Sequence, residues 1–172
     1  MTPFIVPGWT GLLIEANSRS FASLLNLKRN AWSSNLCLSP TKQAQNIVFY
    51  GAHDKNKDAS SGLIPRKDSN TIPIRVNCVP LYSFLLAVNV TTVDYLSLDV
   101  EGSELDILKT IPFEKVLIKV VRLEITSIPG GMEALQPFMQ SKGYAFFTYS
   151  PDPQGPRRYD AIFLHSSVQI QK

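Results

Sequence analysis

The sequence is short of the residues that build metal sites and activated nucleophiles. It contains two cysteines, Cys37 and Cys78, and two histidines, His53 and His165. Their spacing matches no zinc-binding pattern, and we expect no metal site from it. The sequence also lacks a G-x-S-x-G nucleophile turn and a glycine-rich phosphate loop of either common type. Zinc enzymes, serine hydrolases and P-loop nucleotide binding are therefore set aside.

Long apolar runs and blocks of one charge are also missing. No apolar stretch approaches the roughly 20 residues that a membrane-spanning helix needs. Ile5 and Val6 stand among prolines and cannot form the apolar core of a signal peptide. The formal charge is +3, and the densest basic spot is Arg157-Arg158. We therefore expect no membrane segment within these residues and no nucleic-acid partner.

What is present is the composition of a globular protein. The 172 residues suit a single domain over 1–172, and 44% of them are hydrophobic. Two interpretations of Cys37 and Cys78 stay open: buried free thiols, or one disulfide in a lumenal or extracellular domain. The triplet Asn89-Val90-Thr91 is a glycosylation sequon that would fit the second compartment.

Apolar runs alternate with helical patterns along the chain. We expect a helix capped by Ser18 or Ser20, a helix opened by Pro80, a helix opened by a capping-box-like pair of Ser103 and Asp106, and a helix kinked or broken at Pro137. A polar loop is expected over 53–70. Strands are expected at residues 11–16, 35–38, 46–52, 71–79, 93–100, 116–125, 144–149 and 160–165. This order predicts an α/β fold with a mostly parallel sheet, a small β insertion and an antiparallel strand at the C-terminal end.

Acidic residues stand where the expected parallel strands end. Glu15, Asp99 and Glu124 each close such a strand, and Glu101 follows in the turn. Ligands of these folds bind beyond the carboxyl ends of the strands, and a strand-end acid can accept hydrogen bonds from ribose hydroxyls. A solvated carboxylate without a ligand is the alternative for Glu15.

The densest acidic segment is Asp99-Val100-Glu101-Gly102-Ser103-Glu104, directly after the strand over 93–100, which we expect to be buried on both faces. Like charges this close repel unless a cation, a hydrogen-bond donor or a helix N-terminus compensates them. Either Glu101 and Glu104 only lie at the N-terminus of the helix while Asp99 binds backbone amides, or Asp99 or Glu101 faces a pocket for a cofactor and an acceptor.

Four blocks of the sequence resemble the FkbM-type methyltransferase family. They are residues 9–17 (WTGLLIEAN), 36–39 (LCLS), 79–81 (VPL) and 94–104 (DYLSLDVEGSE). The resemblance implies a Rossmann-like class I fold that uses S-adenosylmethionine, with methyl transfer to oxygen in some members. It implies that Asp99 and Glu101 are catalytic, and that the cofactor-binding residues are Glu15, Asn17, Ser39 and Asp99. A generic nucleotide-binding α/β domain with another cofactor is a weaker possibility.

The closest resemblance within the family is to the animal Star-like branch. That branch implies a different role, namely a non-enzymatic, membrane-anchored factor that assists cargo export through the secretory pathway. The blocks around Cys37 and Cys78 resemble that branch, which favours a disulfide and an ER/Golgi or endomembrane location over a cytoplasmic one. The partner would then be a cargo protein instead of an unknown acceptor substrate.

The sequence departs from the family before the first matching block. Family members carry a strand, a glycine-containing turn and a helix ahead of the Ile-Glu-Ala strand, and here only Met1–Gly8 precede Trp9. That turn wraps the methionine part of the cofactor. We therefore expect an N-terminally truncated domain that lacks the first strand and helix and that is inactive as this chain.

Overall fold

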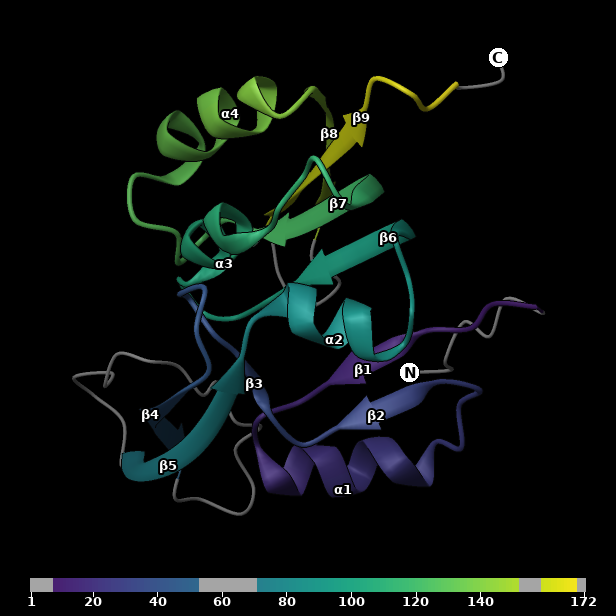
Figure 1. The fold of residues 1–172 in the computed structure, drawn as a ribbon. Helices are drawn as coiled ribbons and strands as arrows, with labels where there is room; N and C mark the ends of the chain where they lie inside the picture. Colours follow the sequence, from purple (N-terminus) through teal and green to yellow (C-terminus); the bar gives the residue numbers. More distant parts are fainter. Residues whose placement is uncertain (1–7, 53–70, 152–158, 170–172) are drawn as a thin grey trace. The chain divides into compact units, whose positions relative to one another are not determined.

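The computed structural model describes residues 8–52, 71–151 and 159–169 (Figure 1). The expected loop over 53–70 and Arg157-Arg158 lie outside the described residues. The chain divides into two compact units, Met1–Leu38 with Ala44–Val79, and Ser39–Gln43 with Pro80–Lys172. We describe each unit by itself.

The first unit contains two small sheets. β1 (Leu12–Ile14) and β2 (Trp32–Ser34) are parallel, and α1 (Ser18–Asn26) connects them. β3 (Cys37–Leu38) runs parallel to β5 (Thr71–Val79), and β5 pairs antiparallel with β4 (Gln45–Ala52). The expected strands over 46–52 and 71–79 are confirmed, and the structure adds that they pair with each other in antiparallel fashion. The strand expected over 35–38 is shorter in the structure, where β2 ends at Ser34 and β3 covers only Cys37–Leu38.

The cap of α1 is Asn17, so the prediction of Ser18 or Ser20 was wrong. The Asn17 Oδ1 accepts hydrogen bonds from the backbone N–H of Arg19 at 2.9 Å and of Ser20 at 3.3 Å. Asn17 has extended backbone angles, which place its side chain over the free amides of the first turn. Ser18 is already the first helical residue and cannot serve as the cap.

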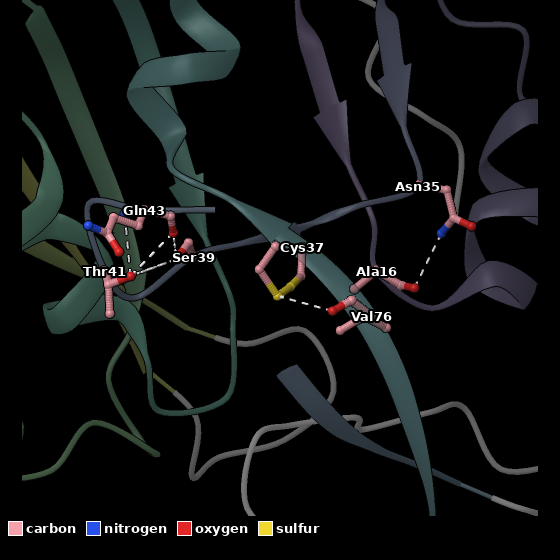
Figure 2. Close-up of a disulfide and its surroundings, with 8 residues drawn as sticks. Ala16, Asn35, Cys37, Ser39, Thr41, Gln43 and Val76 are labelled. Atoms are coloured by element: carbon pink, nitrogen blue, oxygen red, sulfur yellow. Dashed lines mark hydrogen bonds between the residues drawn. A yellow bond between two sulfur atoms is a disulfide. The ribbon is translucent and has the colours of Figure 1, made fainter. Parts of the chain in front are cut away.

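A disulfide joins Cys37 and Cys78 (Figure 2). The two residues are direct partners in the register of β3 and β5, which brings their side chains together. Nearby, the Asn35 side-chain amide donates hydrogen bonds to the carbonyl oxygens of Glu15 at 2.8 Å and Ala16 at 3.2 Å. Of the two interpretations of the cysteines, the structure has the disulfide.

The second unit is built on one four-stranded sheet. Its order is β6 (Thr92–Leu98), β7 (Leu117–Glu124), β9 (Tyr159–His165) and β8 (Tyr144–Pro151). β6 and β7 are parallel, whereas β9 is antiparallel to both β7 and β8 (Figure 1). The helices of this unit are α2 (Leu81–Ala87), α3 (Glu104–Thr110) and α4 (Gly131–Ser141). The predicted antiparallel C-terminal strand is confirmed.

β7 supplies the centre of the core of this unit. Its side chains Ile118, Val121 and Leu123 are fully buried, and so is Phe163 on β9. The Tyr144 hydroxyl donates a 2.7 Å hydrogen bond to the Ile118 carbonyl, and burial raises the pKa of that hydroxyl to about 12. The helices contribute further buried side chains, namely Leu81, Leu85, Ile107, Leu108, Leu135 and Met139.

Two local predictions for this unit need correction. β6 is not buried on both faces, because it is the end strand of its sheet and, of its side chains, Leu98 alone is buried. α4 continues from Gly131 to Ser141, so of the kink or break expected at Pro137 the break is absent. Pro137 lies on the exposed side, where water can satisfy the Glu133 carbonyl that loses its helical partner.

The described residues thus form a mixed α/β fold with several sheets and four helices. Parallel pairing occurs in each of the three sheets, and the remaining pairing is antiparallel. Among the described residues, no helix is both long and apolar enough to cross a membrane.

Candidate functional site

The acidic strand ends of the second unit meet at one edge of its sheet. β6 and β7 are parallel with Leu98 opposite Leu123, so the next residues, Asp99 and Glu124, lie side by side at this edge. Carboxylate oxygens of Asp99, Glu104 and Glu124 all lie within 4.8 Å of one another. Asp99 is exposed, whereas Glu104 and Glu124 are buried. We call these three residues the acidic cluster.

Glu104 closes the turn that leads from β6 into α3. Its side chain is fully buried, with Oε1 accepting from the backbone N–H of Val100 at 2.8 Å and Oε2 from that of Gly102 at 3.0 Å. Burial raises the pKa of Glu104, Asp99 adds to the rise, and the backbone amides oppose it. Glu104 is therefore part of the acidic turn itself and not a solvated decoration of the helix.

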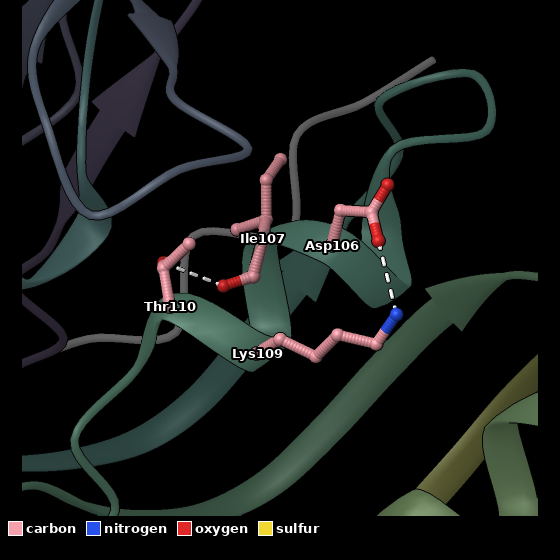
Figure 3. A network of polar contacts seen from close by, with 4 residues as sticks. All are labelled: Asp106, Ile107, Lys109 and Thr110. Atoms are coloured by element: carbon pink, nitrogen blue, oxygen red, sulfur yellow. Dashed lines mark hydrogen bonds and ion pairs between the residues drawn. The ribbon is translucent and has the colours of Figure 1, made fainter.

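The capping-box-like pair predicted for α3 is not formed. Ser103 precedes the helix, but its side chain makes no capping hydrogen bond. Asp106 instead binds Lys109 at 3.1 Å on the exposed side of the helix (Figure 3). The side chain that binds backbone amides here is Glu104, and those amides, of Val100 and Gly102, precede the helix.

The acidic turn requires two residues in the left-handed backbone region. Glu101 has a φ of 55°, and Gly102 has a φ of 107°. A Cβ at Gly102 would lie 2.8 Å from the backbone oxygen of Ser127, so only glycine fits there without movement. The Ser127 hydroxyl donates a 3.5 Å hydrogen bond to Glu101 Oε2, which connects the turn to the segment after β7.

Glu124 is the most perturbed carboxyl of the cluster. Its residue is 5% exposed, and its Oε2 atom has no hydrogen-bond partner among the described residues. Burial raises its pKa to about 7, with further contributions from the charges of Asp99, Glu101 and Glu104 that outweigh a hydrogen bond from Thr126. A proton or a cation at this oxygen would remove the cost of burying an unpaired charge.

Of the other predicted site residues, two lie in the first unit and one in the second. Glu15 follows β1, and its Oε1 accepts from the backbone N–H of Asn17 at 2.7 Å. Ser39 is buried in the second unit, where its hydroxyl donates to the Gln43 carbonyl at 2.8 Å and accepts from the Thr41 N–H (Figure 2). The roles of these residues in cofactor binding stay predictions.

The set of site residues predicted from the sequence omitted Glu104 and Glu124. Asp99 and Glu101 lie in one turn, as predicted. Glu104 binds a backbone amide of that turn, and Glu124 lies beside it in the acidic cluster. Glu124 ends the next expected strand along the chain. Pairing that strand in parallel with the strand before Asp99 would have placed the two acids side by side.

The second unit is a mixed α/β unit with a cluster of acids at the ends of neighbouring parallel strands. Such a cluster can accept a proton, bind a cation or orient a hydroxyl group. A family model described as the methyltransferase FkbM domain matches residues 3–146, so the chain belongs to the FkbM methyltransferase family. Searches of curated proteins and of solved structures found no match.

We predict that Gly102→Ala destabilises the chain by about 1–3 kcal/mol, because it combines a positive φ with a contact to the Ser127 carbonyl. Gly131→Ala is the matched control, since Gly131 also has a positive φ, of 51°, but open space around its Cβ position. Urea unfolding measures both variants. Equal costs would show that the contact with Ser127 contributes nothing.

We predict that the stability contributed by Glu124 is fully present below pH 4.5 and is lost as the pH rises through about 7, because folding raises its pKa. In the presence of a chelator, the free energy of unfolding should fall by up to about 3 kcal/mol from this group over that range. Glu124→Gln should remove this part of the pH dependence. Unfolding at several pH values measures it, and an unchanged slope in the variant would contradict the prediction.

Proposed function

We propose that this chain is an S-adenosylmethionine-dependent methyltransferase domain that transfers a methyl group to an acceptor oxygen. Membership of the FkbM family over residues 3–146 carries the proposal. The parallel β6–β7 pair and the antiparallel β9 support a Rossmann-like class I arrangement as its fold. The acids at the ends of β6 and β7 support a polar binding edge there.

The polar groups that the proposal assigns to the cofactor fit its chemistry. The Glu15 carboxylate accepts from the Asn17 amide through Oε1, and a carboxylate is the kind of group that can accept hydrogen bonds from two neighbouring ribose hydroxyls. Asn17 holds the start of α1 and so fixes the segment after Glu15. Bound S-adenosylmethionine would supply the activated methyl group.

Asp99 is proposed as the base of the reaction, with Glu101 beside it. The acceptor hydroxyl oxygen forms the new bond to the methyl carbon as the carbon–sulfur bond breaks, and Asp99 takes the hydroxyl proton. Asp99 is exposed and can reach a bound acceptor, whereas Glu104 is buried and accepts a hydrogen bond from the backbone of the turn. Most of the rate enhancement would come from positioning the acceptor.

Calorimetric titration with S-adenosylmethionine tests the proposal. We expect 1:1 binding, weakened about tenfold or more by Glu15→Gln, which keeps an oxygen for the Asn17 amide but removes the charge that the ribose hydroxyls would bind. Glu133→Gln is the control, because Glu133 is an exposed acid on α4. A folded chain that does not bind would contradict the proposal and support the sequence-based expectation of an inactive domain.

A second candidate function is a non-enzymatic factor of the secretory pathway, of the Star-like kind, with a cargo protein as partner. The Cys37–Cys78 disulfide favours it, because disulfides persist in oxidising compartments. Asn89 of the Asn-Val-Thr sequon is exposed, as a glycan acceptor must be.

Expression in cells with a secretory signal tests this candidate. We expect a glycan at Asn89, absent in Asn89→Gln, and an intact Cys37–Cys78 disulfide by mass spectrometry of the unreduced protein. Reduction should cost about 3–4 kcal/mol of stability, given the 41-residue separation. A reduced pair in protein isolated from the cytosol would contradict the secretory role and favour the enzyme.

A further inference from the structure

The acidic cluster has a feature that a solvated group of acids does not have. Glu104 and Glu124 are at most 5% exposed, so bulk water does not balance their charges. The Glu124 Oε2 atom is buried and has no hydrogen-bond partner among the described residues. Glu124 is also one of the three residues whose carboxylates lie within 4.8 Å of one another. A buried carboxylate oxygen without a partner costs free energy unless a ligand completes it.

We propose that Asp99, Glu104 and Glu124 form a binding site for one hard divalent cation, of the size of Mn²⁺ or Ca²⁺. This departs from the sequence-based expectation of no metal site. The site shares Asp99 with the reaction proposed above, but cation binding is measured without methyl transfer, so the two proposals can fail separately.

The spacing of the oxygens fits such a cation. Two oxygens on opposite sides of a cation bound at about 2.4 Å lie about 4.8 Å apart, and adjacent ligands lie closer. The carboxylate oxygens of the cluster all lie within 4.8 Å of one another, so one cation can contact all three side chains without a rearrangement of the backbone. Carboxylate oxygens without nitrogen or sulfur ligands suit hard cations such as Mn²⁺ and Ca²⁺.

The cluster is also held in place before a cation binds. The two oxygens of Glu104 are held in place by the amides of Val100 and Gly102. Glu124 is the last residue of the central strand β7. Three basic side chains of the same unit bind acids outside the cluster: Lys109 binds Asp106, Lys119 binds Asp94, and Arg122 binds Asp160.

Calorimetric titration of the chelator-treated full chain with MnCl₂, and separately with CaCl₂, at pH 7.5 tests the proposal. We expect one site with a Kd below about 1 mM for at least one of the two cations, within the range of protein calcium sites. Glu124→Gln should weaken binding by about tenfold or more, because it replaces a charged ligand by an amide of the same shape. Thermal unfolding of the same samples should show stabilisation by the cation in the wild-type chain and not in the variant.

Asp106→Asn is the matched control. Asp106 lies on the same helix as Glu104 but pairs with Lys109 on the exposed side (Figure 3). It should leave the affinity unchanged. Circular dichroism establishes that each variant is folded, and Glu104→Gln provides a second test if Glu124→Gln unfolds. Failure of both cations to bind, equal affinity in Glu124→Gln, or equal losses in Asp106→Asn would overturn the proposal.

Discussion

The acidic edge of the second unit depends on one buried interaction, the hydrogen bonds from the Val100 and Gly102 amides to the Glu104 carboxylate. These bonds turn the chain sharply between β6 and α3, and they allow Asp99 to stay exposed while Glu104 is enclosed. A charge buried beside another acid is costly, so the turn is stable only because its amides compensate that charge. The same turn brings Glu101 within reach of the Ser127 hydroxyl.

The parallel register of β6 and β7 places Glu124 beside this turn. Without that register, Glu124 would be an ordinary strand-end acid. Beside the turn, it becomes a buried group with a pKa near 7 and an oxygen without a partner among the described residues. The family to which the chain belongs and the chemistry proposed for it both concern this edge, but the perturbation of Glu124 follows from burial and neighbouring charges alone.

Much of the order of elements could be predicted from the sequence, because apolar runs such as 116–125 and 144–149 are strong local signals, and β7 and β8 lie there. The remaining features could not be predicted from apolar patterns or residue propensities. Asn17 and Ser18 are adjacent capping residues, and propensity does not choose between them. The role of Glu104 depends on a non-glycine residue, Glu101, in the left-handed region, which no pattern of apolar residues reveals. The exposure of β6 depends on its place in the sheet, which is a property of tertiary pairing.

The Cys37–Cys78 bond has a consequence for the covalent structure of the chain. It encloses the segment between the two cysteines, which includes β4 and most of β5, in a closed covalent ring. A single peptide-bond cleavage inside that ring opens it but leaves both pieces in one molecule. The strands β3 and β5, which pair at the site of the bond, would remain tethered to each other after such a cut. As long as the bond is oxidised, a nick in this segment changes the connectivity of the polypeptide without separating its N-terminal part from the acidic edge of the second unit.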